Sequence, residues 1–201
     1  MDRKNTVILL APIVLIIVMY AVFRLLAGSY GNTIAWYGGL FVYWLLFGAA
    51  FPLLAVGARE IVQLVRPRGM TPAVLMLAAL PIIIATVGRL VFGMEYEKPS
   101  TLIAIFLVIT AIGNGVFEEI FWRGLFLNQF RGSVWFGMLW PSFMFGMWHY
   151  DPGSISHPDC VVPLMVGSVF FGLLLSYMAR RSGTIFWGIL SHTLAGLIMV
   201  I

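Results

Sequence analysis

Long, uninterrupted apolar runs restrict the fold of this chain more than any other feature of its sequence. Hydrophobic residues make up 61% of its 201 positions and charged residues only 10%. Most of the runs approach the ~20 residues that an α-helix needs to cross a bilayer. Seven can be marked, at residues 6–28, 34–57, 72–94, 101–117 (continuing toward 130), 134–149, 161–179 and 184–201.

The pattern inside these runs favours helices. The strands of a membrane β-barrel would alternate apolar and polar residues, and these runs do not. The sequence therefore predicts an all-α, polytopic membrane helix bundle of about seven transmembrane helices in a single domain, residues 1–201. The polar residues of interest lie between positions 114 and 192. Residues 1–70 are therefore expected to form scaffold helices, and residues 101–201 are expected to form the catalytic helices.

Lysine and arginine residues gather in alternate connections between the runs. These connections contain Arg3, Lys4, Arg59, Arg66, Arg68, Arg131, Arg180 and Arg181. The other connections carry little positive charge, and residues 95–100 are net acidic. The positive-inside rule then predicts an integral cell-membrane protein with its N-terminus in the cytoplasm and its C-terminus outside.

The net charge of +4 is explained by this topology and by the lipid bilayer as partner, without nucleic acid. A cleaved signal peptide is the alternative interpretation of residues 1–28. An uncleaved first helix is preferred, because the run is long for a signal peptide and no clear cleavage site follows it.

Five ionisable residues interrupt the later apolar runs. Glu118 and Glu119 are adjacent, Arg123 follows one helical turn later, and His149 and His192 lie in two further runs. Ionisable groups inside a membrane are costly and usually face a partner or a wet cavity. Glu119 and Arg123 are four residues apart and are expected to pair. Glu119 is still counted with Glu118, His149 and His192 as a candidate catalytic residue, and Arg123 and Phe145 as supporting residues. Glu118 is turned by about 100° from Glu119 around the helix axis, so we assign it to a cavity.

Depth in the bilayer links three of these residues. Counted from the nearest cytoplasmic arginine at the ideal helical rise, Glu118 lies at about 20 Å, His149 at about 25 Å and His192 at about 16 Å. The sequence therefore predicts that the three side chains converge on one buried, partly wet cavity. Asn114, four residues before Glu118, shares its helix face and is expected to support the site.

Two kinds of chemistry fit a glutamate with two histidines. The glutamate can activate water as a general base, and a histidine can donate a hydrogen bond to the oxyanion that forms when water attacks an amide. Alternatively, Glu118, His149 and His192 could bind zinc, with water as the fourth ligand. The spacing HExxH of soluble zinc proteases is absent, so we expect no cofactor and keep zinc as the alternative.

Three sequence blocks resemble one known family. Residues 118–123, EEIFWR, fit the pattern EExxxR, and residues 145–149, FGMWH, fit FxxxH, in which Phe145 is the first residue. Residues 181–192, RSGTIFWGILSH, resemble a third block that ends in histidine. Their order and spacing resemble the CPBP superfamily, which includes CAAX prenyl endopeptidases and bacteriocin-processing proteins. The resemblance covers about residues 101–201.

The resemblance implies an intramembrane endopeptidase that acts on a membrane-associated protein or peptide. It implies that Glu118 activates water, and that His149 and His192 assist it and stabilise the oxyanion. One position departs from the family pattern: Gly196 stands where asparagine is common, four residues after the last histidine. Asn114 is the candidate replacement for this lost donor.

Two other classes of protein are alternatives. A non-catalytic immunity or scaffold protein of the same fold would explain Gly196. A small transporter with an ion-coupled glutamate would explain Glu118, but it gives no reason for both histidines.

Overall fold

The chain folds into a bundle of helices. The computed structural model describes residues 2–92, 100–156 and 158–200, and every regular element in these residues is helical. The acidic connection predicted at 95–100 lies outside the described residues, except for Ser100. The α-helices are α1 (Arg3–Tyr30), α2 (Asn32–Tyr43), α3 (Phe51–Val56), α4 (Ala58–Leu64), α5 (Pro72–Phe92), α6 (Thr101–Gly113), α7 (Leu125–Phe130), α8 (Trp140–Trp148), α9 (Tyr150–Ser156), α10 (Val161–Ser182) and α11 (Phe186–Val200).

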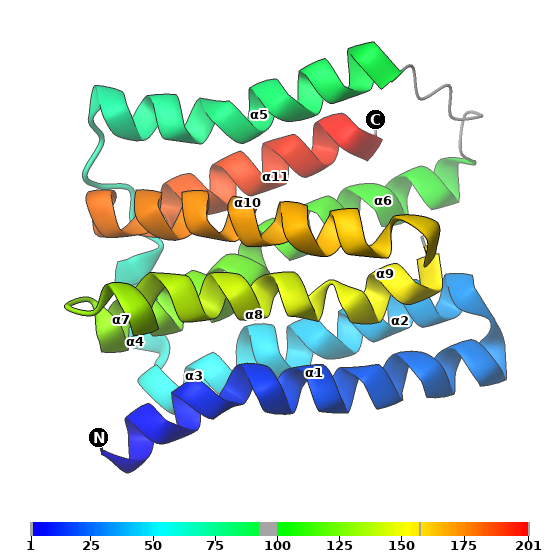
Figure 1. Cartoon of the computed structure of the whole chain (residues 1–201), viewed down its shortest axis with the longest axis horizontal. Coiled ribbons are helices and arrows are strands. Elements are labelled where there is room, and N and C mark those ends of the chain that lie inside the picture. Colours follow the sequence, from blue (N-terminus) through cyan, green and yellow to red (C-terminus); the bar gives the residue numbers. More distant parts are fainter. Residues whose placement is uncertain (1, 93–99, 157, 201) are drawn as a thin grey trace.

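Shorter non-α segments join some of these helices into longer rods. Four are π-helical: η1 (Trp44–Ala50), η2 (Asn114–Glu118), η3 (Ile120–Gly124) and η4 (Trp135–Leu139). A 3₁₀ segment, η5 (Pro158–Cys160), precedes α10. The rods run side by side along one direction, with α1 against α2, α8 against α10 and α5 against α11 (Figure 1).

The long helices are suited to a bilayer. Five rods in the described part are long and apolar enough to cross a membrane: Arg3–Tyr30, Asn32–Val56, Pro72–Val91, Thr101–Phe130 and Pro158–Ser182. They correspond to five of the seven predicted runs. The other two are shorter, because α11 has 15 residues and a turn at His149 separates α8 from α9. The count of seven spans and the orientation of the chain stay predictions.

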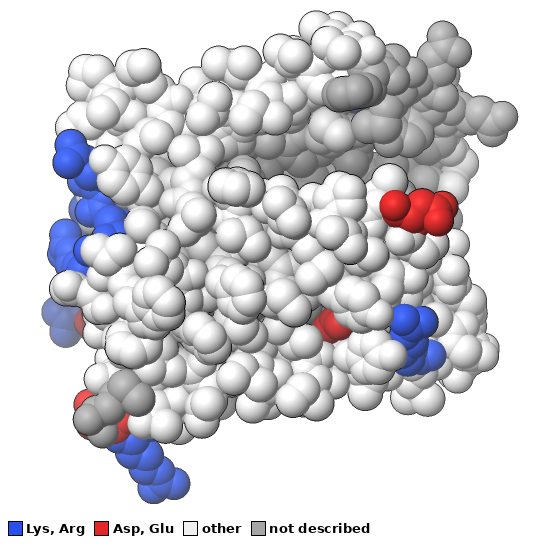
Figure 2. Space-filling view, in the orientation of Figure 1, with Lys and Arg blue, Asp and Glu red and all other residues white. Residues whose placement is uncertain are grey.

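The outer surface agrees with a lipid environment. Large apolar side chains such as Leu54, Met76 and Leu90 point outward. Figure 2 shows that Lys and Arg gather mainly along one end of the bundle, while the broad face between the two ends is almost free of charge. A surface this apolar matches hydrocarbon rather than water. The chain is therefore an all-α integral membrane protein.

The buried core of the bundle is aromatic. Trp148 of α8 is fully buried, with its ring centroid 4.4 Å from that of Tyr43 and 6.0 Å from that of Phe23. Trp122 donates its indole N–H to the Tyr43 hydroxyl at 2.9 Å. The helices before residue 70 therefore contact the predicted site directly, because Phe23 and Tyr43 pack behind the helices that hold the predicted catalytic residues.

The helix predicted to continue past the glutamates does so, from Thr101 to Phe130. Its middle is π-helical at η2 and η3, where a continuous α-helix was expected. Single π-helical turns inside α-helices are often found at functional sites. The wider turn changes the predicted alignment of Asn114 with Glu118.

Candidate active site

Glu119 is the centre of a buried charge network. It is 0% exposed, and its Oε1 atom accepts a hydrogen bond from Nη1 of Arg123 at 2.9 Å. The predicted pair is therefore present. The same oxygen lies 3.1 Å from Nδ1 of His192 on α11. An ionised carboxylate only accepts hydrogen bonds, so this contact puts a proton on Nδ1 and directs Nε2 elsewhere.

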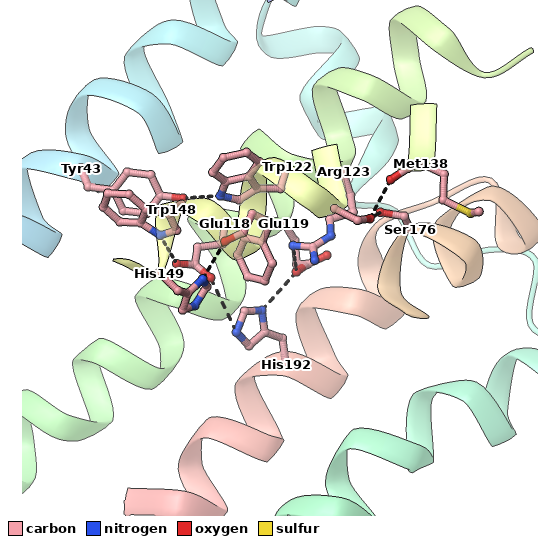
Figure 3. Close-up of polar contacts among 12 residues, drawn as sticks. Tyr43, Glu118, Glu119, Trp122, Arg123, Met138, Trp148, His149, Ser176 and His192 are labelled. Carbon is pink, nitrogen blue, oxygen red and sulfur yellow. Dashed lines mark hydrogen bonds and ion pairs between the residues drawn. The ribbon is translucent and has the colours of Figure 1, made fainter. Parts of the chain in front are cut away.

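Glu118 faces the other nitrogen of the same histidine. It is 2% exposed, its Oε1 accepts from the indole N–H of Trp148 at 3.4 Å, and its Oε2 lies 3.8 Å from Nε2 of His192. The last distance is too long for a direct hydrogen bond. His192 thus lies between the two glutamates, bonded to Glu119 and facing Glu118 (Figure 3).

His149 joins the site through Phe145. It lies at the end of α8, and its Nδ1 donates to the carbonyl oxygen of Phe145 at 2.8 Å. The Phe145 ring lies edge-on to both histidines, with centroids 4.6 Å from His149 and 6.5 Å from His192, and Arg123 stacks on it at 4.3 Å. Within the described residues, no hydrogen bond or ion pair joins His149 to a glutamate. Phe145 is therefore the side chain that the two histidines share.

Several buried polar atoms of the network have no hydrogen-bond partner within the described part of the protein. They are Oε2 of Glu119, together with Nε and Nη2 of Arg123. Buried polar groups of proteins are nearly always hydrogen-bonded. These atoms therefore keep the capacity to bind water or a polar group of a substrate, as a wet cavity requires.

Asn114 lies at the start of η2, and Gly196 lies on α11. The Asn114 Oδ1 atom accepts from the indole N–H of Trp44 at 3.0 Å, which leaves its NH₂ group as a donor. A Cβ atom at Gly196 would lie 3.3 Å from the Cβ of Ala111. Close packing of α11 on α6 therefore accounts for glycine where the related pattern has asparagine. The role of Asn114 as replacement donor stays a proposal.

A large apolar cavity borders the network. Its volume is about 840 Å³, and it lies between α5, α10 and α11. Its wall includes Ala195, one turn after His192, and Phe171, whose ring centroid lies 4.8 Å from that of His192. The candidate site can therefore be approached along an apolar surface.

A zinc site would require Glu118, His149 and His192 to point at one common position. Among the described residues, no group of three His, Cys, Asp or Glu side chains is arranged to hold a metal ion. His149 directs Nδ1 to a backbone carbonyl, and in the described part of the chain the ion-pair contact of Glu118 with a histidine is made by His192. The three predicted ligands thus do not form a zinc site as they stand.

Neither spacing nor composition predicted two of the contacts. The indole N–H of Trp148 on Glu118 and the His192–Glu119 bond join residues that are 30 and 73 positions apart. Trp148 lies inside FxxxH, directly before the histidine, and this adjacency was the one available signal.

Comparison with known families gives one match. Residues 99–198 match the family described as type II CAAX prenyl endopeptidase Rce1-like, and the chain belongs to that family. The match includes all seven predicted site residues, from Asn114 to His192. No curated protein and no solved structure matches the sequence.

Proposed function

We propose that this protein is an intramembrane endopeptidase that hydrolyses a peptide bond in a membrane-associated protein or peptide. The observation that carries the proposal is His192 between two buried glutamates, bonded to one at 3.1 Å and facing the other at 3.8 Å. A structural ion pair needs only Glu119 and Arg123. The second carboxylate, facing an imidazole nitrogen, is the part that a scaffold would not require.

In this mechanism Glu118 is the general base. Water attacks the carbonyl carbon of the peptide, its oxygen bonds to that carbon, and one of its protons passes to Glu118. The tetrahedral intermediate then breaks its carbon–nitrogen bond, and Glu118 returns the proton to the leaving amine. A carboxylate inside a bilayer is suited to this exchange, because it is poorly solvated and therefore accepts a proton more readily than a carboxylate in water.

His192 stabilises the oxyanion. Its Nδ1–H donates to Glu119 at 3.1 Å, which fixes the orientation of the ring. When both ring nitrogens carry a proton, the second donor, Nε2–H, lies on the side of Glu118. A donor aimed at the developing negative charge in a water-poor site is worth roughly 10²–10³ in rate.

His149 has a different role. Its Nδ1–H is bonded to the Phe145 carbonyl, so in the neutral ring Nε2 carries the lone pair. We assign it to accepting a hydrogen bond from the attacking water and orienting it toward the carbonyl carbon.

One observation favours a second function. Gly196 removes a donor that the related pattern has, which a non-catalytic immunity or scaffold protein of the same fold would tolerate. Zinc chemistry is a further alternative for the mechanism, and it predicts sensitivity to chelation.

Mapping of peptide termini in membranes tests the proposal. Cells that express the wild-type chain should contain membrane-protein termini that are absent from cells expressing equal amounts of Glu118→Gln. Identical sets of termini in the two membranes would favour the scaffold function.

A further inference from the structure

A second cavity lies at the arginine-rich end of the bundle, and neither Glu118 nor Glu119 lines it. Its volume is about 260 Å³, and it opens between α4, α7 and the turn that follows α10. Its polar lining consists of Glu60, Gln63, Arg68, Asn128, Arg131 and the backbone at Gly183. None of these residues belongs to the proposed mechanism.

The walls of this cavity are held together by hydrogen bonds. Arg68 donates from Nε and Nη2 to the carbonyl oxygen of Gly183, at 3.0 and 2.6 Å. Thr184 donates its hydroxyl to the Leu64 carbonyl at 2.6 Å. The linker after α4 is thereby fixed to the turn after α10, so the cavity is part of the fold.

Both guanidinium groups meet at Gly183. This residue has φ +72°, a left-handed conformation that glycine adopts without strain. A Cβ atom there would lie 3.1 Å from Nη2 of Arg131. The missing side chain therefore makes room for Arg131 beside the Gly183 carbonyl that Arg68 already binds.

The charges in the cavity are not neutralised by each other. In the described part of the chain, the carboxylate of Glu60 has no basic nitrogen within ion-pair distance, and Arg131 has no hydrogen-bond acceptor. Two cations, one anion and the amides of Gln63 and Asn128 thus surround a space of about 260 Å³ with unused hydrogen-bonding capacity. A ligand with both a negative and a positive group complements this set.

The position of the cavity indicates where such a ligand comes from. The helices α3, α7 and α10 all end at this end of the bundle, which also carries most of the Lys and Arg residues in Figure 2. The ends of membrane-spanning helices lie at the level of the lipid headgroups. Basic pockets at this level bind lipid headgroups, and the planar guanidinium matches the geometry of phosphate.

We propose that this cavity binds the headgroup of an aminophospholipid. Arg68 and Arg131 bind the phosphodiester, and Glu60 accepts hydrogen bonds from the primary ammonium group. A choline headgroup has no N–H to donate, and a glycerol headgroup has no positive charge. The site should therefore prefer phosphatidylethanolamine to phosphatidylcholine and phosphatidylglycerol.

Native mass spectrometry of the purified full chain tests the preference. Dioleoyl-phosphatidylethanolamine, -phosphatidylcholine and -phosphatidylglycerol are added separately, and bound lipid is counted. Arg131→Gln should weaken both phosphatidylethanolamine and phosphatidylglycerol by about two- to fivefold, the range expected for one exposed ion pair. Glu60→Gln should lower phosphatidylethanolamine to the level of phosphatidylcholine and leave phosphatidylglycerol unchanged.

Arg181→Gln is the matched control. It removes one exposed arginine at the same end of the bundle, outside the cavity, and it should leave lipid selectivity unchanged. Equal binding of the three lipids, or an equal effect of Arg131→Gln and Arg181→Gln, would overturn the proposal. Binding of free phosphoethanolamine without any bound lipid would overturn the assignment to a membrane lipid.

Discussion

At the scale of single residues, Trp148 connects the aromatic core to the proposed general base. It is fully buried against Tyr43, and its indole N–H reaches Glu118 at 3.4 Å. Trp122 is equally buried and donates to the Tyr43 hydroxyl instead. The two tryptophans therefore differ in the group that they hold, while their packing is similar.

This difference predicts two outcomes for the same substitution. Trp148→Phe should lower kcat by about tenfold at nearly unchanged KM, because loss of one hydrogen bond to a charged group costs ~1.4 kcal/mol or more. Trp122→Phe should lower thermal stability and leave kcat within about twofold. Steady-state kinetics measure kcat and a melting curve measures stability for the two variants. Equal losses of kcat would show that Trp148 does not position Glu118.

Glu119 has a structural and a proposed catalytic role, because one of its oxygens accepts hydrogen bonds from both Arg123 and His192. Glu119→Gln removes the negative charge from a buried pair and should lower the free energy of unfolding by about 3 kcal/mol. Glu118→Gln, with no cation bonded to it, should cost clearly less. Thermal unfolding in detergent compares the two, and a greater loss for Glu118→Gln would contradict the assignment of the ion pair.

At the scale of elements, small residues set how closely α11 approaches the helix of the glutamates. A Cβ atom at Gly115 would lie 2.9 Å from the backbone nitrogen of Thr193 and 3.0 Å from its Cα atom. Thr193 follows His192, so a shift of α11 moves the histidine. The position of this catalytic candidate thus depends on a glycine of another helix.

Gly115→Ala should therefore displace α11 and lower both stability, by about 1–3 kcal/mol, and activity. Gly28→Ala in α1 is the matched control, because a Cβ atom there meets nothing within 4 Å. It should be neutral or slightly stabilising. Melting temperature and initial rate distinguish the two variants, and a harmless Gly115→Ala would show that α11 tolerates the added methyl group.

The elements also show what the sequence could predict. Hydropathy predicted the helical rods, and the spacing of Glu119 and Arg123 predicted their pair, since both depend on local periodicity. The His192–Glu119 bond depends on how α11 is rotated about its own axis, which contacts at Gly115 and Gly196 decide. The π-helical turns at the glutamates could not be predicted either, because the same residues are compatible with an α-helix.

At the scale of the whole molecule, the orientation in the membrane decides from which side a substrate reaches the proposed site. Cys160 lies in η5 and is exposed, at the end of the bundle predicted to face outside. A membrane-impermeant maleimide should label it from the outside of intact cells. Arg66→Cys in a Cys160→Ser background should be labelled only after the cytoplasmic side is exposed. The reverse pattern would invert the topology.

The central claim, that Glu118 activates water for peptide hydrolysis, is tested most directly in proteoliposomes with a substrate found by terminus mapping. Wild-type protein should cleave it, and Glu118→Gln should be folded, inserted and inactive, because glutamine keeps the shape of the side chain but cannot accept the proton of water. Strong chelation should leave the wild-type rate unchanged if no metal takes part, whereas loss on chelation and recovery with zinc would support the metal alternative. Full activity of Glu118→Gln would contradict both mechanisms.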